Sequence, residues 1–363
     1  MRNGLMAALA CAVASPALAG GVERSTQPMS ILFEEGRYLE AGASFGSPSL
    51  TGNLAAGFGS SPTGNIAKSF FTGAIGYKAD INDKLSYAII FDEPIGADVV
   101  YPAGSALATL SGEIKSKALT GVLRYKFGGG VSAYAGLRSV WTSGAVSIPA
   151  AVVSALGGPA ADYVMTSNTD QAFGYLVGVA YEKPEIALRV ALTYQSEIEH
   201  GFTAQESFGG APLPATGFSS TIPDSLTLDF RSGVAKDTLV FGSVRWVNWK
   251  DFVIPAPALG GRAIVSYPKN SMTYTLGVGR KFTENWSGSI SVSHDTGTGN
   301  PTSNLGPVGK RNSIGLGVSY TRDAMTISAG VQYSRIGSAT TTLGSTFDDN
   351  SAVGAGMRVG FRF

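Results

Sequence analysis

Short stretches in which every second residue is apolar recur along this chain, and the segments that join them alternate strictly in length. A period of two places the apolar side chains on one face of a β-strand. Six connections are short, near 81–84, 128–130, 183–185, 236–237, 283–285 and 322–323. Seven are long and rich in Gly, Pro, Ser and Thr, near 47–66, 94–108, 149–168, 200–224, 253–270, 296–311 and 336–350. This order begins and ends with a long connection, so it requires fourteen strands with both chain ends beside the short turns.

The segment 353–363 shows the alternation most clearly. Its two faces carry Val353, Ala355, Met357, Val359, Phe361 and Phe363 against Gly354, Gly356, Arg358, Gly360 and Arg362. An even number of strands with one apolar face, joined by alternating short and long connections, is the organisation of an outer-membrane barrel. We therefore predict an all-β fold, a transmembrane antiparallel β-barrel of fourteen strands over 38–363. A secreted β-solenoid or β-sandwich is the alternative, but neither requires connections of strictly alternating length.

Residues 1–19 have the parts of a signal peptide: Arg2, an apolar stretch over 5–14, and small residues at 17–19. A lipoprotein signal ending at Cys11 is the alternative, although the apolar stretch before this cysteine would be very short. Cleavage after residue 19 removes the only cysteine, which excludes cysteine nucleophiles and thiolate metal sites. An export signal followed by a barrel predicts the outer membrane of a Gram-negative bacterium.

Composition and motifs exclude several function classes. Charged residues make up 15% of the chain and the formal net charge is +1, so we predict no nucleic-acid partner. The sequence has no nucleotide-binding loop and no metal-ligand spacing, so we predict no cofactor and no metal. Of its two histidines, His200 falls in a long connection and His294 in the run Ser293–His294–Asp295. Adjacent strand residues point to opposite faces and cannot form a catalytic triad among themselves, so we predict no catalytic residue and no enzyme.

The predicted interior is partly apolar. The stretch 238–249 carries Leu239, Phe241 and Val247 on one face and Val240, Val244 and Trp246 on the other. Single apolar residues also lie opposite the main apolar row of their strands, namely Ile90, Val122, Val140 and Leu176. A local bulge would return such residues to lipid. Without bulges they line an interior suited to a hydrophobic ligand, with Phe241 and Leu176 as candidate contacts.

Five stretches, in their order along the chain, resemble the FadL/TodX family of outer-membrane transporters for long-chain fatty acids and other hydrophobic compounds. They are Phe91–Gly96, Ile222–Leu228, Trp246–Phe252, Glu284–Trp286 and His294–Thr296. The resemblance extends over nearly all of the chain after the signal peptide, and it implies a fourteen-stranded barrel. It also implies that the barrel assembly machinery recognises the terminal strand with its last aromatic residue, Phe363.

Pro94 and Gly96 match the break that follows the third strand in this family. Proline cannot donate a hydrogen bond to a β-ladder, and glycine permits the chain to bend. The resemblance implies a lateral gate at these two residues, through which an apolar ligand leaves sideways into outer-membrane lipid. The start of an ordinary loop is the alternative interpretation.

The chain departs from the family at its N-terminus, where family members carry a hatch with an Asn-Pro-Ala-like motif. The matching place is Thr26–Met29, and few residues precede it after cleavage. We predict a short hatch-like segment, 20–37, with a helix over Pro28–Glu35 that begins after Thr26 and stops at Gly36. Most of the family's hatch is missing here, so the family's gating does not transfer directly.

Three arginines are expected to point inward, because each lies opposite lipid-facing apolar positions of its strand: Arg138, Arg189 and Arg245. A guanidinium in a confined lumen can bind a carboxylate through two hydrogen bonds. We therefore predict that these arginines hold the acid group of a fatty acid. The alternative is that they pair with lumen carboxylates such as Asp229 and maintain the shape of the barrel.

These observations together predict a channel for passive uptake of hydrophobic small molecules across the outer membrane. Long-chain fatty acids or hydrocarbons are the expected ligands, and membrane lipid surrounds the barrel. Two other functions stay open at this point: a general porin for hydrophilic solutes, and a structural or adhesive barrel that acts through its loops.

Overall fold

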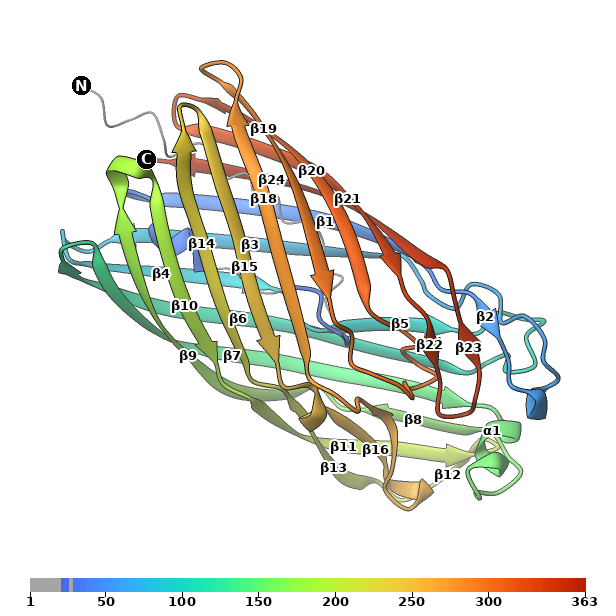
Figure 1. Ribbon diagram of the computed structural model, residues 1–363. Helices are drawn as coiled ribbons and strands as arrows, with labels where there is room; N and C mark the ends of the chain where they lie inside the picture. The colour runs from blue at the N-terminus through green and yellow to red at the C-terminus, as the bar shows by residue number, and fades with distance from the viewer. Residues whose placement is uncertain (1–20, 26–28) are drawn as a thin grey trace.

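Fourteen antiparallel strands close into one barrel in the computed structural model, which describes residues 21–25 and 29–363 (Figure 1). The predicted signal peptide, 1–19, lies outside the described residues. Ten strands cross without interruption: β1 (Tyr38–Ser49), β3 (Phe70–Asp80), β6 (Ser111–Gly128), β7 (Val131–Ile148), β15 (Thr238–Val247), β18 (Ser271–Lys281), β19 (Trp286–Asp295), β20 (Arg311–Arg322), β21 (Met325–Ile336) and β24 (Asn350–Arg362). Four cross in two segments: β4 (Leu85–Asp92) with β5 (Gly96–Val100), β8 (Tyr163–Ser167) with β9 (Asp170–Lys183), β10 (Leu188–Gln195) with β11 (Ile198–Phe208), and β13 (Thr216–Ile222) with β14 (Ser225–Ala235). The barrel closes because β1 pairs with both β24 and β3, which confirms the predicted fold class.

Side chains alternate between the two faces of the wall as the sequence predicts. On β7, Leu137 is 71% exposed on the outer face, whereas Arg138 is only 4% exposed on the inner face. Val122, Val140 and Leu176 are buried inside the barrel. The inward placement of these apolar residues is therefore confirmed, and the bulge interpretation is wrong for them.

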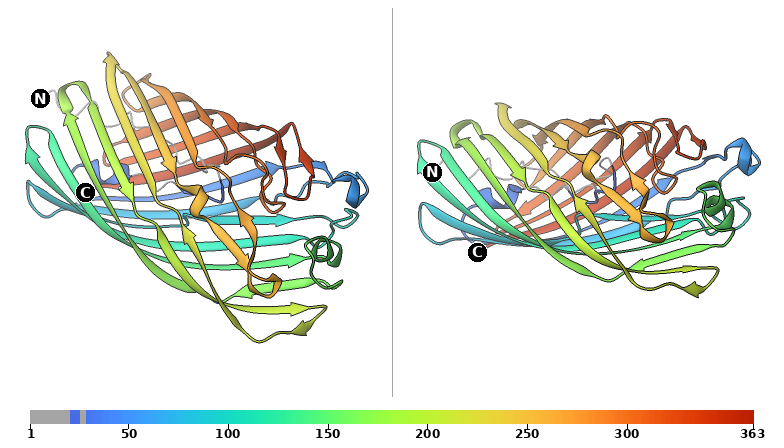
Figure 2. Two further views of the ribbon diagram at one scale, coloured as in Figure 1. Left: turned by 60° about the horizontal axis from the view of Figure 1, so that its bottom comes forward. Right: turned by 90° about the horizontal axis from the view of Figure 1, so that it is seen from below.

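The two ends of the barrel differ in their connections. The six predicted short connections lie together at one end, here called the turn end, on the left of Figure 1. The long connections gather at the opposite end, here called the loop end, as Figure 2 shows from two further sides. They form a small sheet of β2 (Gly52–Asn53), β23 (Thr346–Phe347) and β22 (Ala339–Thr340), a hairpin of β16 (Val253–Ala256) and β17 (Arg262–Ser266), and the helix α1 (Ala150–Ala155). Among the described residues, no helix is long and apolar enough to cross a membrane.

One of the predicted long connections is largely strand, and a second begins with one. The prediction of a loop over 200–224 is wrong, because β11 and β13 extend the wall there and leave a turn with the two-residue strand β12 (Ala211–Pro212). The predicted connection 94–108 likewise begins with β5. Glycine, serine and threonine give these segments the composition of a loop. Their inward positions are nevertheless buried, as at His200 and Phe202 of β11.

A short helix fills the barrel at the turn end. The predicted helix over Pro28–Glu35 is a shorter 3-10 helix, η2 (Met29–Phe33), and Pro28 lies outside the described residues. Met29, Ile31 and Leu32 are buried in a cluster with side chains from β4, β6, β7, β9 and β10. Gly76 of β3 permits this approach, because an added Cβ would lie 2.5 Å from the Cδ1 atom of Ile31.

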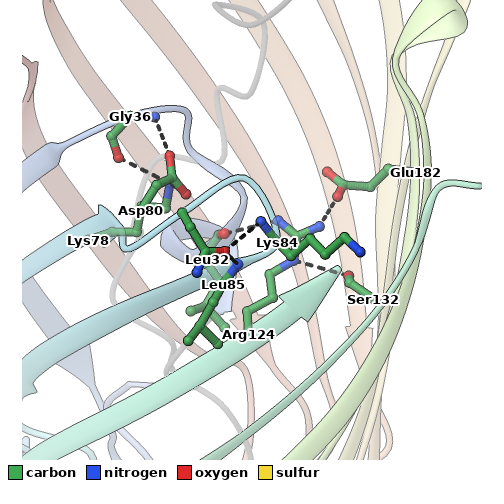
Figure 3. Close-up of polar contacts among 10 residues, drawn as sticks. Leu32, Gly36, Lys78, Asp80, Lys84, Leu85, Arg124, Ser132 and Glu182 are labelled. Carbon is green, nitrogen blue, oxygen red and sulfur yellow. Dashed lines mark hydrogen bonds and ion pairs between the residues drawn. The ribbon is translucent and has the colours of Figure 1, made fainter. Parts of the chain in front are cut away.

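Polar contacts fix this helix to the wall (Figure 3). Arg124 of β6 donates a hydrogen bond of 3.1 Å to the carbonyl of Leu32 and pairs with Glu182 of β9. Lys78 of β3 donates a hydrogen bond of 3.1 Å to the carbonyl of Gly36. Residues 29–36 are thus held on two sides, and they occupy the lumen at the turn end.

Candidate ligand channel

An apolar cavity lies inside the loop-end half of the barrel. Its volume is about 810 Å³, which includes space open to solvent. The inner faces of β6, β7, β11 and β13 form one side, and the loop around β16 and β17 contributes Phe252, Ile254 and Val265. Val22 near the N-terminus also lines the cavity, as do Ile95 and Ala97 where the wall is interrupted. The cavity therefore connects the loop end with the interruption between β4 and β5.

The wall is interrupted at Pro94, as the sequence suggests. Pairing of β3 with β4 ends at Ile75 and Phe91, and β5 resumes pairing with β6 at Gly96. Ser116 of β6 bridges the interruption, because its hydroxyl accepts from the amide of Ile95 at 2.9 Å and donates to its carbonyl at 2.6 Å. Among the described residues, 70–74 of β3 have no strand partner on this side. β4 and β5 are two segments of one interrupted strand, and beside the interruption this stretch of the neighbouring strand β3 has no described partner on that side. This unpaired stretch between β3 and β5 is here called the wall break.

Residues 21–25 pair with the open edge of the wall break. The amide of Arg24 donates to the carbonyl of Pro94 at 2.8 Å, and the amide of Gly96 donates to the carbonyl of Val22 at 2.9 Å. The carbonyl of Pro94 and the amide of Gly96 point away from β6, toward the side where β3 provides no partner. The side chain of Arg24 packs closely on Gly96, because an added Cβ would lie 2.5 Å from its Nε atom and would displace it. The N-terminal segment therefore lies along the edge of the wall break and pairs with it through a single β-bridge, between Glu23 and Ile95.

A buried ion pair ties the same segment to the opposite wall. Arg245 of β15 donates to both carboxylate oxygens of Glu23, at 2.5 Å from Nη2 and 3.3 Å from Nε, and both side chains are buried. Its Nη1 atom donates to the hydroxyl of Thr227 at 2.7 Å. The inward placement of Arg245 is confirmed, but its carboxylate partner is Glu23 and not Asp229. The guanidinium of Arg245, which we predicted to bind the carboxylate of a ligand, thus already binds the carboxylate of Glu23.

The predicted site residues lie at two levels of the barrel. Arg138 is buried in the lumen, where it experiences the charges of Arg245, Glu23 and Asp92, and its Nε atom has no hydrogen-bond partner among the described residues. Arg189 lies at the turn end instead, with its guanidinium 4.4 Å from the ring centre of Phe33.

The two predicted apolar contacts also lie toward the turn end. Leu176 packs in the cluster around η2, and Phe241 lies on β15 opposite Gly277 of β18. Neither these residues nor the three arginines line the apolar cavity, so their contact with a ligand stays a prediction.

One polar cluster at the cavity was missed by the sequence analysis. His200 is 0% exposed on β11, its Nδ1 atom lies 2.9 Å from Oδ2 of Asp170, and its Nε2 atom lies 3.2 Å from Oγ1 of Thr142. Its ring stacks on Phe202, with 5.5 Å between ring centres. The period-two order of His200 and Phe202 was the available signal, and the loop-like composition of the segment hid it. No group of three metal-ligating side chains is found in the part of the chain that the structure describes.

Comparisons with known proteins agree with this architecture. The sequence model of the family "Outer membrane protein transport protein (OMPP1/FadL/TodX)" matches residues 10–360. A FadL homologue from Pseudomonas aeruginosa has a similar structure, with a TM-score of 0.75, 17% identity, and coverage of 93% of this chain and 92% of that chain.

Two toluene transporters have similar structures as well. TodX of Pseudomonas putida has a TM-score of 0.66 and 13% identity, with 93% of each chain covered. TbuX of Ralstonia pickettii has a TM-score of 0.67 and 15% identity, with coverage of 96% of this chain and 97% of that chain. No curated protein matches the sequence.

Proposed function

We propose, from the premise that this chain belongs to the OMPP1/FadL/TodX family of outer-membrane transport proteins, that hydrophobic molecules cross its cavity and leave sideways through the wall break. The protein is an outer-membrane β-barrel of a family of transport channels for hydrophobic compounds, and not an enzyme. Short turns in such barrels face the periplasm and long loops face the outside. One observation carries the proposal: Ile95 and Ala97 line the apolar cavity and also border the wall break.

The turn end supports a sideways route over an axial one. The helix η2 is packed among buried side chains of the barrel, including Val122 and Leu176. Phe33 lies between two guanidinium groups, with Arg124 at 4.3 Å and Arg189 at 4.4 Å from its ring centre. An axial route into the periplasm would require this cluster to unpack. At the wall break, by contrast, residues 21–25 are the described residues that hydrogen-bond to the open edge, so a sideways exit requires this short segment to move.

The lining of the cavity supports hydrophobic solutes over hydrophilic ones. Its surface comes mainly from aliphatic and aromatic side chains, such as Ile114, Phe202 and Ile254. A hydrated solute would lose water contacts there without gaining hydrogen bonds, which is costly. We therefore favour uptake of hydrophobic molecules over the function of a general porin, with long-chain fatty acids as the proposed ligand class.

In this proposal a fatty acid competes with Glu23 for Arg245. The internal carboxylate already makes two hydrogen bonds with the guanidinium, so an incoming acid binds there only when Glu23 leaves. Departure of Glu23 also loosens its neighbours Val22 and Arg24 from the edge of the wall break. Binding of the acid and opening of the wall break are thereby linked through one segment.

The substitution Glu23→Gln tests this competition. It keeps the shape of the side chain but removes its charge, so Arg245 becomes available to the ligand. We expect the affinity for a long-chain fatty acid, relative to its methyl ester, to rise about tenfold, which is about 1.4 kcal/mol. Equilibrium binding to the purified barrel measures both affinities.

The variant Glu23→Gln/Arg245→Leu is the control, because it leaves neither charge buried alone. The acid should lose its gain over the ester in this double variant. An equal gain for acid and ester in Glu23→Gln would instead show that Arg245 has a structural role only.

A further inference from the structure

The cavity is apolar apart from a few polar groups. Two of these groups, His200 and Thr142, are joined with Asp170 by hydrogen bonds into one chain, here called the row. Thr142 and His200 both line the cavity. Asp170 and Thr142 are directly opposite each other on β9 and β7, so both point inward with His200 of β11. The row is therefore assembled from three strands, and it meets the cavity at Thr142 and His200.

The distances in this row indicate where its protons lie when Asp170 is ionised and the ring of His200 is neutral. An ionised carboxylate only accepts hydrogen bonds, so the Nδ1 atom of His200, 2.9 Å from Asp170, carries the proton of the neutral ring. The Nε2 atom is then an acceptor, and the hydroxyl of Thr142 donates to it across 3.2 Å. Thr142 has no second proton, so its oxygen can only accept from any further partner.

The position of the imidazole ring is restrained by stacking. His200 stacks on Phe202, and Phe202 stacks on Phe218 of β13, with 5.1 Å between the latter ring centres. The stack holds the plane of the ring, and turning the ring over within that plane would break the bond between Nδ1 and Asp170. In this protonation state Thr142 therefore presents an acceptor oxygen to the cavity.

We propose that Thr142 recognises a hydrogen-bond donor on the ligand. The cavity then prefers apolar molecules that carry one neutral hydroxyl group, such as alkylphenols or long-chain alcohols, over matched molecules whose only polar group is an acceptor. This inference rests on the proposed function, since it takes the apolar cavity as the place where the ligand binds. A donor pairs with the oxygen of Thr142, whereas an ether oxygen meets another acceptor and gains nothing.

The test compares 4-pentylphenol with its methyl ether, 4-pentylanisole, which differ mainly in the presence of the donor. Affinities for the purified full-length barrel are measured by calorimetry and corrected for partition of each compound into detergent. We expect the wild-type protein to prefer the phenol about fivefold, within the range that one neutral hydrogen bond provides. Thr142→Val, which replaces the hydroxyl by a methyl group, should reduce this ratio to about one.

Two further variants make the test specific. Thr142→Ser retains the hydroxyl and should retain the preference, which shows that a loss in Thr142→Val does not come from misfolding. His200→Phe keeps an aromatic ring beside Phe202 but removes the acceptor, so the freed hydroxyl of Thr142 can donate. The ether should then gain affinity relative to the phenol.

The outcomes separate this inference from the proposed function. Binding of both compounds by wild type with equal affinity, and an unchanged ratio in Thr142→Val, would overturn the role of Thr142 while leaving the cavity as the binding site. Failure of both compounds to bind at all would overturn the proposed cavity itself.

Discussion

Uptake of a long-chain fatty acid should fall at least about tenfold in the double variant Pro94→Val/Gly96→Val. A tenfold fall corresponds to a rise of about 1.4 kcal/mol in the free-energy barrier to exit. A valine in place of Pro94 supplies the amide proton that proline lacks, so the edge of the wall break can continue a ladder. A side chain in place of Gly96 would displace the side chain of Arg24, whose Nε atom lies 2.5 Å from the added Cβ, and weaken the packing of residues 21–25 on this edge. Once residues 21–25 no longer bind this edge, residues 70–74 of β3 can pair with it and make the wall continuous.

Uptake of radiolabelled fatty acid into cells, normalised to the amount of folded barrel, measures this effect. Pro255→Val is the matched control, because Pro255 lies in the hairpin β16–β17 and not at the wall break. Its uptake should equal that of wild type. Unchanged or increased uptake by a correctly assembled double variant would remove the wall break from the mechanism.

Replacement of the last residue, Phe363→Asp, should reduce the amount of folded barrel in the outer membrane to about a tenth or less. Phe363 follows β24, its ring is exposed, and its amide donates to the carbonyl of Arg37 at 2.9 Å. We infer from the resemblance that the assembly machinery recognises this terminal aromatic strand. The cost of one aspartate at the membrane edge is small, about 1 kcal/mol or less, so stability alone does not account for such a loss.

Heat-modifiable migration of outer-membrane fractions in gel electrophoresis measures assembly. Phe282→Asp is the control, because Phe282 is also an exposed aromatic residue at the turn end but is not terminal. It should assemble nearly as well as wild type. Equal yields of the two variants would contradict recognition of Phe363.

The wall of the barrel could be predicted from sequence because its rules are local. The period of two assigned Leu137 to lipid and Arg138 to the lumen, and the structure agrees. The alternating connections led to the strand number, since each short turn joins neighbouring strands. The same local rule failed at 200–224, where glycine and serine between apolar residues gave a strand the composition of a loop.

The contacts of the N-terminal segment could not be predicted in this way. Glu23 and Arg245 are separated by 222 residues, and nothing in the sequence near either one indicates the other. The edge that residues 21–25 contact exists because 70–74 of β3 have no described strand partner on this side, although the chain just before β3 pairs with β5 at Ala67 and Val99. The row Asp170–His200–Thr142 likewise comes from three strands, so no single stretch of sequence contains it.

The central claim is that the ligand leaves through the wall and not along the barrel axis. Photo-crosslinking with a fatty acid that carries a diazirine near the end of its tail, in native outer membranes, tests this directly when labelled peptides are identified by mass spectrometry. We expect labels on residues of the cavity and the wall break, such as Ile95, Ala97 and Phe71, and a loss of the label at Phe71 in Pro94→Val/Gly96→Val. Labels concentrated on Met29–Phe33 and Leu176 at the turn end would show an axial route and contradict the account.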